Sequence, residues 1–450
     1  MTERATDSSP PVAKVPARGL VRTTLVLLPL QIVFRAGEGL MPFLLAFWFG
    51  ANRATDVYKF TWAVFLFAGS LVFSAFHDSA LVPILAEARL RDRDSVRTIT
   101  GSLLAYTWVI GGLLAVGVSA IALGWFSVRY QGETFELAAL MVPALAVQLV
   151  ALSTKTLFAA VLSAHHAFVP YPIASAASVI VNIGFIALMH DSMGVLAIPV
   201  GTMLGEIVAA AILAFVTARW IGVVPALTFA RPAPVMRFAR LVISEVGGNS
   251  VTRINPVVDQ MMAELVNVAG GLTLLGLSYD VASVPTSLLQ ASLLSVLLAH
   301  LSDDFVARDI AKLRATVARA AIVVFSILAV AALLLTLVRE PLLRLVFFHG
   351  EMKLDAVQRM AHIFPYHLVG LAPFGVLLVM SRAHTAIQNS RIMLGMGILN
   401  ASMNVAFNLV LIKPLGLEGI ALSTSCVHTF VAIVFWVLFE RSARQLARAS

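Results

Sequence analysis

The chain has little charge and almost no cysteine. Asp, Glu, Lys and Arg make up 12% of its 450 residues, whereas apolar residues make up 59% and the mean hydropathy is +0.91. Soluble domains carry about 25% charged residues, so this composition excludes a soluble enzyme. A single cysteine, Cys426, excludes an internal disulfide and any metal or redox site that needs several cysteines.

The motifs of several enzyme classes are also missing from the sequence. It contains no Gly-Lys pair and therefore no Walker A loop, and it has no HExxH, GxSxG or paired-cysteine signature. Its short loops leave no room for an ATP-binding domain. We therefore expect a transporter, not an enzyme, and an ion gradient or the membrane potential as its source of energy.

Long apolar runs are what the sequence has in abundance. They continue for 20 residues or more, whereas the strands of a membrane β-barrel alternate apolar and polar residues over about ten positions. The runs predict an all-α polytopic membrane protein with about 12 transmembrane helices. The expected spans are 20–49, 60–76, 98–126, 137–162, 168–189, 194–216, 241–266, 271–301, 317–338, 356–380, 392–412 and 416–439.

The basic residues are distributed unevenly between the two sides of these spans. With the N-terminus inside, the tails and cytoplasmic loops hold 21 Lys and Arg residues and the opposite loops hold 8. The positive-inside rule therefore places both termini in the cytoplasm. We expect a disordered tail at 1–18 and a basic tail at 440–450. The net charge of +8 thus reflects orientation in the membrane and does not indicate nucleic-acid binding.

The two halves of the chain share an internal repeat. Five identities recur at one offset, pairing Asn182 with Asn404, Phe185 with Phe407, Gly194 with Gly416, Ile198 with Ile420 and Thr202 with Thr424. This offset predicts two parallel six-helix lobes at 19–217 and 241–439, joined by a cytoplasmic linker at 218–240. A substrate site is expected in the cleft between such repeats.

One arginine lies near the middle of the first helix of each lobe. An ionisable residue at membrane depth is a functional hypothesis by default, and guanidinium suits phosphate or pyrophosphate. Arg35 and Arg253 are therefore candidate substrate-binding residues. The structural alternative pairs Arg35 with Glu38, and Arg253 with Glu245 or Asp259.

A second group of polar residues offers only oxygen ligands. Asn404 and Asn408 share one helix face, Thr424 lies on the next span, and Asp259 lies on the first helix of the same lobe. Such hard ligands suit a small cation, so Na+ is the candidate cofactor. The repeat favours a structural alternative for two of them, since Asn182 and Thr202 duplicate Asn404 and Thr424.

Several stretches resemble one transporter family. FGANRATDVYKF, ALVPILAEARLRDRD, INPVVDQMMAEL, PLLRLVFFHGEM and VAFNLVLIKPLGLEGIALSTS are similar to the MurJ/MviN lipid II flippases, within the multidrug/oligosaccharidyl-lipid/polysaccharide exporter superfamily. The resemblance covers nearly the whole chain, although family members commonly have fourteen spans. It implies a V-shaped two-lobe fold with alternating access to a central cationic cavity.

The resemblance also implies roles for individual residues. Arg35 corresponds to a cavity arginine and Asp56 to an aspartate at the outward gate. Asp259, Asn404 and Thr424 resemble ligands of a sodium site, and Asn408 stands where a carboxylate can occur. Several family charges are replaced, at Met41, Gly69, Ser70, Ser74, Tyr279 and Asp280.

The leading hypothesis is therefore a flippase in the bacterial inner membrane for a polyprenyl-linked glycan, either lipid II or another cell-envelope precursor. Its expected partners are this glycan lipid and membrane lipids. We expect a monomer, with envelope glycan-synthesis enzymes as candidate associates. The alternatives are a cation-coupled exporter of small drugs and a membrane scaffold that transports nothing, because a fold alone does not choose among them.

Overall fold

The structure is a computed structural model. It describes Pro29, Gly37 and residues 39–69, 81–91, 93–241 and 255–449, and the described residues form helices without strands. The first helical stretch is Gly39–Phe49. The labelled helices are α2 Arg53–Gly69, α3 Val82–Arg91, α4 Arg93–Arg129, α5 Glu133–Ala164, α6 Pro170–Met193, α7 Ala197–Val216, α9 Asn255–Val266, α10 Gly271–Ala282, α11 Val284–Val306, α12 Ile310–Leu337, α13 Arg339–Phe347, α14 Leu354–Leu368, α15 Leu371–Ala386, α16 Ser390–Leu415 and α17 Leu417–Ala449. A further helix spans 233–241.

The helices account for the predicted spans. Six described segments are long and apolar enough to cross a membrane, and one of them, Pro170–Ile221, contains both α6 and α7, which pack along each other. Two bent pairs, α10 with α11 and α14 with α15, pass the same test as pairs. The three remaining spans correspond to Gly39–Phe49, α2 and α9, each of which adjoins residues outside the described ranges. The chain is a multi-pass membrane protein of the predicted fold class.

The structure differs from the sequence prediction in its bends. The expected spans 271–301 and 356–380 are each broken, by 45° between α10 and α11 and by 42° between α14 and α15. Pro285, at the start of α11, accounts for the first bend because proline removes a backbone donor and the residue before it avoids helical geometry. Helix α13 was not predicted, since it is short and precedes the apolar run of α14.

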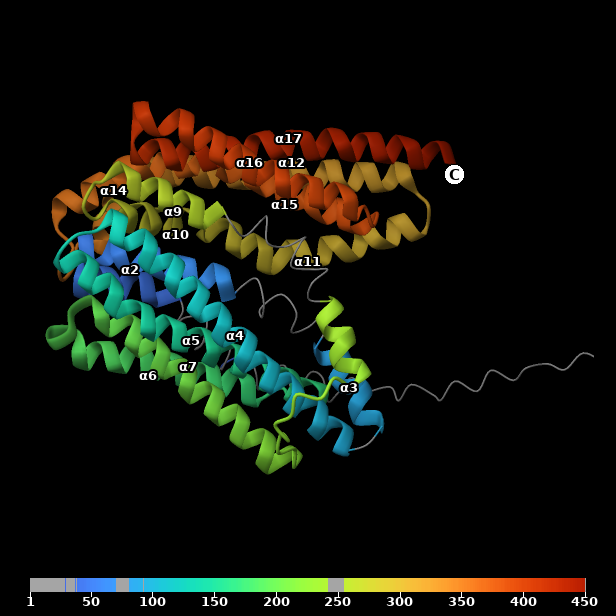
Figure 1. Ribbon diagram of the computed structural model, residues 1–450. Helices are drawn as coiled ribbons and strands as arrows, with labels where there is room; N and C mark the ends of the chain where they lie inside the picture. The colour runs from blue at the N-terminus through green and yellow to red at the C-terminus, as the bar shows by residue number, and fades with distance from the viewer. Residues whose placement is uncertain are drawn as a thin grey trace, which may run out of the picture.

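Two lobes diverge from one end of the molecule (Figure 1). One contains Gly39–Phe49 and α2 to α7, and the other contains α9 to α17. The internal repeat includes two corresponding glycines with the same structural role. Gly194 and Gly416 end α6 and α16, with φ of +54° and +60°. Glycine adopts this left-handed region without a Cβ penalty, so each lobe uses it to turn into its last helix.

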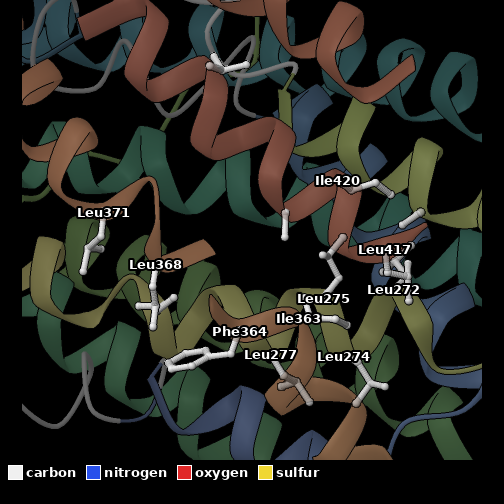
Figure 2. Close-up of a cluster of buried hydrophobic side chains, with 14 of the residues drawn as sticks. Leu272, Leu274, Leu275, Leu277, Ile363, Phe364, Leu368, Leu371, Leu417 and Ile420 are labelled. Carbon is white, nitrogen blue, oxygen red and sulfur yellow. The ribbon is translucent and has the colours of Figure 1, made fainter. Parts of the chain in front are cut away.

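An apolar core fixes α10 where the lobes meet. Buried leucines of α10 pack against Ile363 and Phe364 of α14 and against Leu417 and Ile420 of α17 (Figure 2). Lipid tails are as apolar as leucine, so close packing and hydrogen bonds, not exclusion from water, hold such helices together. This packing therefore fixes the position of α10 within the second lobe.

Candidate functional site

Asp56 joins the two lobes at the end where they meet, called the closed end below. Asp56 is 1% exposed. Oδ2 accepts a hydrogen bond from the Gly270 backbone N–H at 2.7 Å, and Oδ1 accepts from the N–H and hydroxyl of Thr273, both at 2.8 Å. Asp56 thus caps the N-terminus of α10 from the opposite lobe, where free N–H groups and the helix dipole favour a negative charge. This contact fits the gate role that the resemblance implied for Asp56.

A second link between the lobes lies beside Asp56 and was not predicted. The buried carboxylate of Glu264, on α9, lies 3.2 Å from Arg53 and 3.9 Å from Arg129. Arg129 also donates to the Glu264 carbonyl and to Asn267, and Arg53 lies over the ring of Tyr130. The partners of Glu264 lie more than a hundred residues away in the other lobe, so no pattern in the sequence brings them together.

Backbone contacts extend the closed end further. The Glu351 N–H donates to the Phe47 carbonyl at 2.9 Å, and the Phe43 and Phe347 rings stack at 5.3 Å. Gly350 has a φ of +60°, and a Cβ there would lie 2.1 Å from the Phe47 oxygen. Only glycine fits this approach between the lobes.

At the other end, the divergent end, ion pairs join elements within a lobe. Arg237 pairs with Glu87 and thereby fastens helix 233–241 to α3. In the second lobe, Lys312 pairs with Asp304 at 2.6 Å and Arg314 pairs with Glu440 at 2.5 Å. Figure 1 shows α11 and α17 well apart from α3 at this end.

A cavity of about 340 Å³ lies between the lobes, one helical turn from Asp56. Lys59 and Trp62 line it from α2, and the second lobe contributes the rest of its wall. This volume lies in the range of about 300 to 1,000 Å³ that small-molecule sites occupy. The polar residues of the second lobe that line it are Asn255, Asp259, Gln260, Tyr279, Asp280, His367, Asn400, Asn404, Thr424 and His428.

The predicted oxygen cluster is assembled in the wall of this cavity. Asp259 Oδ1 accepts hydrogen bonds from the side-chain amides of Asn404 at 2.9 Å and Asn408 at 2.8 Å. The Thr424 hydroxyl lies 3.4 Å from Oδ2. Asn408 Oδ1 is buried without a hydrogen-bond partner among the described residues. All four candidates from the sequence therefore meet, and they come from α9, α16 and α17.

The arginine candidates cannot be placed in the same way. Arg35 and Arg253 lie outside the described residues, as do Glu38 and Glu245, so their roles stay predictions. Within the first lobe, Lys155 of α5 and Glu206 of α7 form an ion pair at 2.6 Å. Within the described ranges, no group of three or more His, Cys, Asp and Glu residues could hold a metal ion.

Comparison with known proteins gives a consistent result. A probable lipid II flippase MurJ of Haemophilus influenzae is 24% identical over 413 residues, which cover 86% of this chain and 80% of the relative. A solved lipid II flippase MurJ, in an inward closed conformation, has a TM-score of 0.74 and 16% identity over 92% of this chain and 87% of that one. An inward-facing multidrug resistance transporter of the MATE family also has a TM-score of 0.74, with 14% identity over 93% and 96% of the two chains.

The structural likenesses, at such low identity, show the fold. The family follows from the sequence, because residues 45–449 match the family model described as lipid II flippase MurJ. The matched residues include Asp56, the oxygen cluster and the cavity wall described above. This chain therefore belongs to the lipid II flippase MurJ family.

Proposed function

We propose that this protein is a flippase that moves a polyprenyl-pyrophosphate-linked glycan, lipid II or a related cell-envelope precursor, from the cytoplasmic to the outer leaflet. The observation that carries the proposal is the cavity between the lobes, which Asp56 and Glu264 close at one end while the lobes diverge at the other. Such an arrangement is one of the two states that alternating access requires.

The orientation follows from the distribution of charge. Arg89, Arg97 and helix 233–241 lie at the divergent end, and the positive-inside rule places such basic segments in the cytoplasm of a bacterial cell. The closed end then faces outward, so a head group enters the cavity from the cytoplasmic leaflet. The glycan occupies the cavity while the polyprenyl chain stays in the lipid, and Arg35 is the proposed contact of its pyrophosphate.

The oxygen cluster supports Na+ as the coupling ion. Asp259 supplies the negative charge, and Thr424 with Asn404 and Asn408 supplies neutral oxygens. In the arrangement described, both amides turn their nitrogens toward Asp259. A half-turn of each amide group would present Oδ1 instead, and the unpartnered Oδ1 of Asn408 is already buried beside the site. These hard oxygen donors fit a small cation.

A cation at this position would act on the closed end through α9. Asp259 and Glu264 lie on the same short helix, and Glu264 contacts Arg53 and Arg129 of the first lobe. An ion shifts an equilibrium between two states only through its different affinities for them. Sodium therefore couples to transport if it holds α9, α16 and α17 together in one state and is released in the other.

Sodium dependence can be measured on purified protein. We expect Na+, but not K+, to raise the melting temperature in a concentration-dependent way. Asp259→Asn should remove most of the gain and Thr424→Ala part of it. Equal melting curves in the two salts, for wild type and Asp259→Asn alike, would exclude the site.

Transport is tested in proteoliposomes with a fluorescent polyprenyl-pyrophosphate-linked glycan. Wild type should move the lipid between leaflets, Arg35→Ala should abolish movement without loss of folded protein, and Arg35→Lys should restore little because it cannot bind phosphate in bidentate fashion. Movement of a cationic dye in place of the lipid would favour a drug exporter. Movement of neither, in the presence of Na+, would favour a scaffold.

A further inference from the structure

One ion pair at the closed end of the cavity has no role in the mechanism described so far. Lys59, on α2 of the first lobe, lies 3.8 Å from Asp280 Oδ2, on α10 of the second. Both side chains line the cavity, with exposed fractions of 15% and 39%. Lys59 follows Asp56 by one helical turn, so a head group entering from the divergent end would reach this pair last.

The separation of the two groups exceeds that of the other lysine–carboxylate pairs among the described residues. Lys155 with Glu206 and Lys312 with Asp304 both approach to 2.6 Å, which is a direct charge-assisted hydrogen bond. At 3.8 Å Lys59 and Asp280 make no such bond. A hydroxyl group beside the pair can bridge the two groups, because it would accept from the ammonium group and donate to the carboxylate.

Other atoms of the cavity wall also lack partners. Among the described residues, Asn255 Oδ1, Gln260 Oε1 and His367 Nε2 are buried without a hydrogen bond. A buried polar atom without a partner is destabilising, so a ligand that supplies the missing bonds gains affinity from each. Two of the three atoms are amide oxygens, which accept hydrogen bonds and need a donor.

These preferences distinguish between ligand classes. A phosphate group presents acceptors and negative charge, and it would meet the carboxylates of Asp259 and Asp280 in the same cavity. A neutral sugar presents hydroxyl and acetamido groups that donate and accept at once. Trp62, on the same face of α2 as Lys59, adds an aromatic surface on which a sugar ring can pack.

We propose that Lys59 and Asp280 form a two-lobed clamp for a neutral sugar of the head group, with Trp62 as its apolar side. The clamp rests on the proposed flippase function and deepens it, because it assigns recognition of the glycan to this pair and leaves the pyrophosphate to other residues. Since one partner lies on each lobe, a sugar bound between them contacts both halves of the closed end.

The test compares two lipids on the purified protein in nanodiscs: polyprenyl pyrophosphate, and the same lipid carrying one N-acetylhexosamine. Lys59→Met and Asp280→Ala should each weaken binding of the glycosylated lipid about 10- to 100-fold, the effect of losing a hydrogen bond to a charged group. Binding of the bare lipid should stay within twofold. Trp62→Leu should follow the same pattern with a smaller loss.

Lys312→Met is the matched control, because it breaks a lysine–aspartate pair that lies far from the cavity. It should change the affinity for neither lipid. An equal loss for both lipids in Lys59→Met and Asp280→Ala would show a mere lock between the lobes and would overturn the clamp. Unchanged affinity for the glycosylated lipid would overturn it too. Failure of wild type to bind either lipid would overturn the flippase proposal as well, so the two failures are distinguishable.

Discussion

Met41 occupies in the first lobe the position that Asp259 occupies in the second. Met41 precedes the first residue of α2, Arg53, by twelve positions, and Asp259 precedes the first residue of α10, Gly271, by the same number. Their partners correspond as well: the Asn182 amide points at the Met41 sulfur at 3.9 Å, as the Asn404 amide points at Asp259. The first lobe thus contains a neutral copy of the oxygen cluster.

This correspondence predicts that a charged site can be built in the first lobe. Thr202 already lies 3.5 Å from Asn182 Oδ1, and Ile186 is the counterpart of Asn408. Met41→Asp combined with Ile186→Asn, in an Asp259→Asn background, should melt below its parent without sodium, because a buried carboxylate lacks a counter-ion. Added Na+ should restore the melting temperature.

Met41→Leu in the same background is the control, since it keeps the volume and adds no charge. It should respond to Na+ no more than the Asp259→Asn parent does. If the aspartate variant also fails to respond, the polar partners of the first lobe are packing contacts and the two clusters are not equivalent.

The orientation of the chain gives a second prediction. Arg93 begins α4 within the basic segment at the divergent end, which should face the cytoplasm. In a background that lacks Cys426, Arg93→Cys should react with an impermeant maleimide only after the membrane is made permeable. Glu133→Cys, at the start of α5 on the closed side, serves as the opposite control and should react in intact cells. The reverse pattern would invert the orientation.

The sequence predicted the fold class and the oxygen cluster for physical reasons. Apolar runs define spans directly, and Asn404 and Asn408 share a face because they are one helical turn apart. Contacts across the lobes carry no such signal. Lys59 and Asp280 are separated by more than two hundred residues, and only the packing of α10 against α2 brings them together.

The ion pairs of Glu264 with Arg53 and Arg129, called the latch below, should stabilise the closed end. Glu264→Gln removes the negative charge that Arg53 and Arg129 share, so the closed end should open more often. Breaking a fully buried pair costs about 3–5 kcal/mol, and the partial exposure of both arginines should reduce this to about 1–3 kcal/mol. A double-mutant cycle with Arg53→Ala, measured by thermal unfolding, reports the coupling.

Glu133→Gln is the control for the latch, because Glu133 is exposed at the same end of the molecule. It should leave stability unchanged within about 0.5 kcal/mol. A coupling energy near zero between Glu264 and Arg53 would show that the ion pair contributes nothing to closure.

Asp56 should control access to the cavity from the outer side. Asp56→Ala leaves the Gly270 and Thr273 backbone donors without their acceptor in a buried setting, whereas the Thr273 hydroxyl keeps Thr55 Oγ1 as an acceptor. Each loss costs about 1–3 kcal/mol, and about 1.4 kcal/mol changes the ratio of two states tenfold. A cysteine in the cavity wall, introduced as Gln260→Cys in a background that lacks Cys426, should therefore become reactive from the outer side.

Asp355→Ala is the matched control. Asp355 also lies in the first turn of a helix, but its ion pair is with Arg359 of that same helix. It should leave Gln260→Cys protected. Equal protection in the Asp56→Ala variant would mean that the other contacts of the closed end suffice to keep it shut.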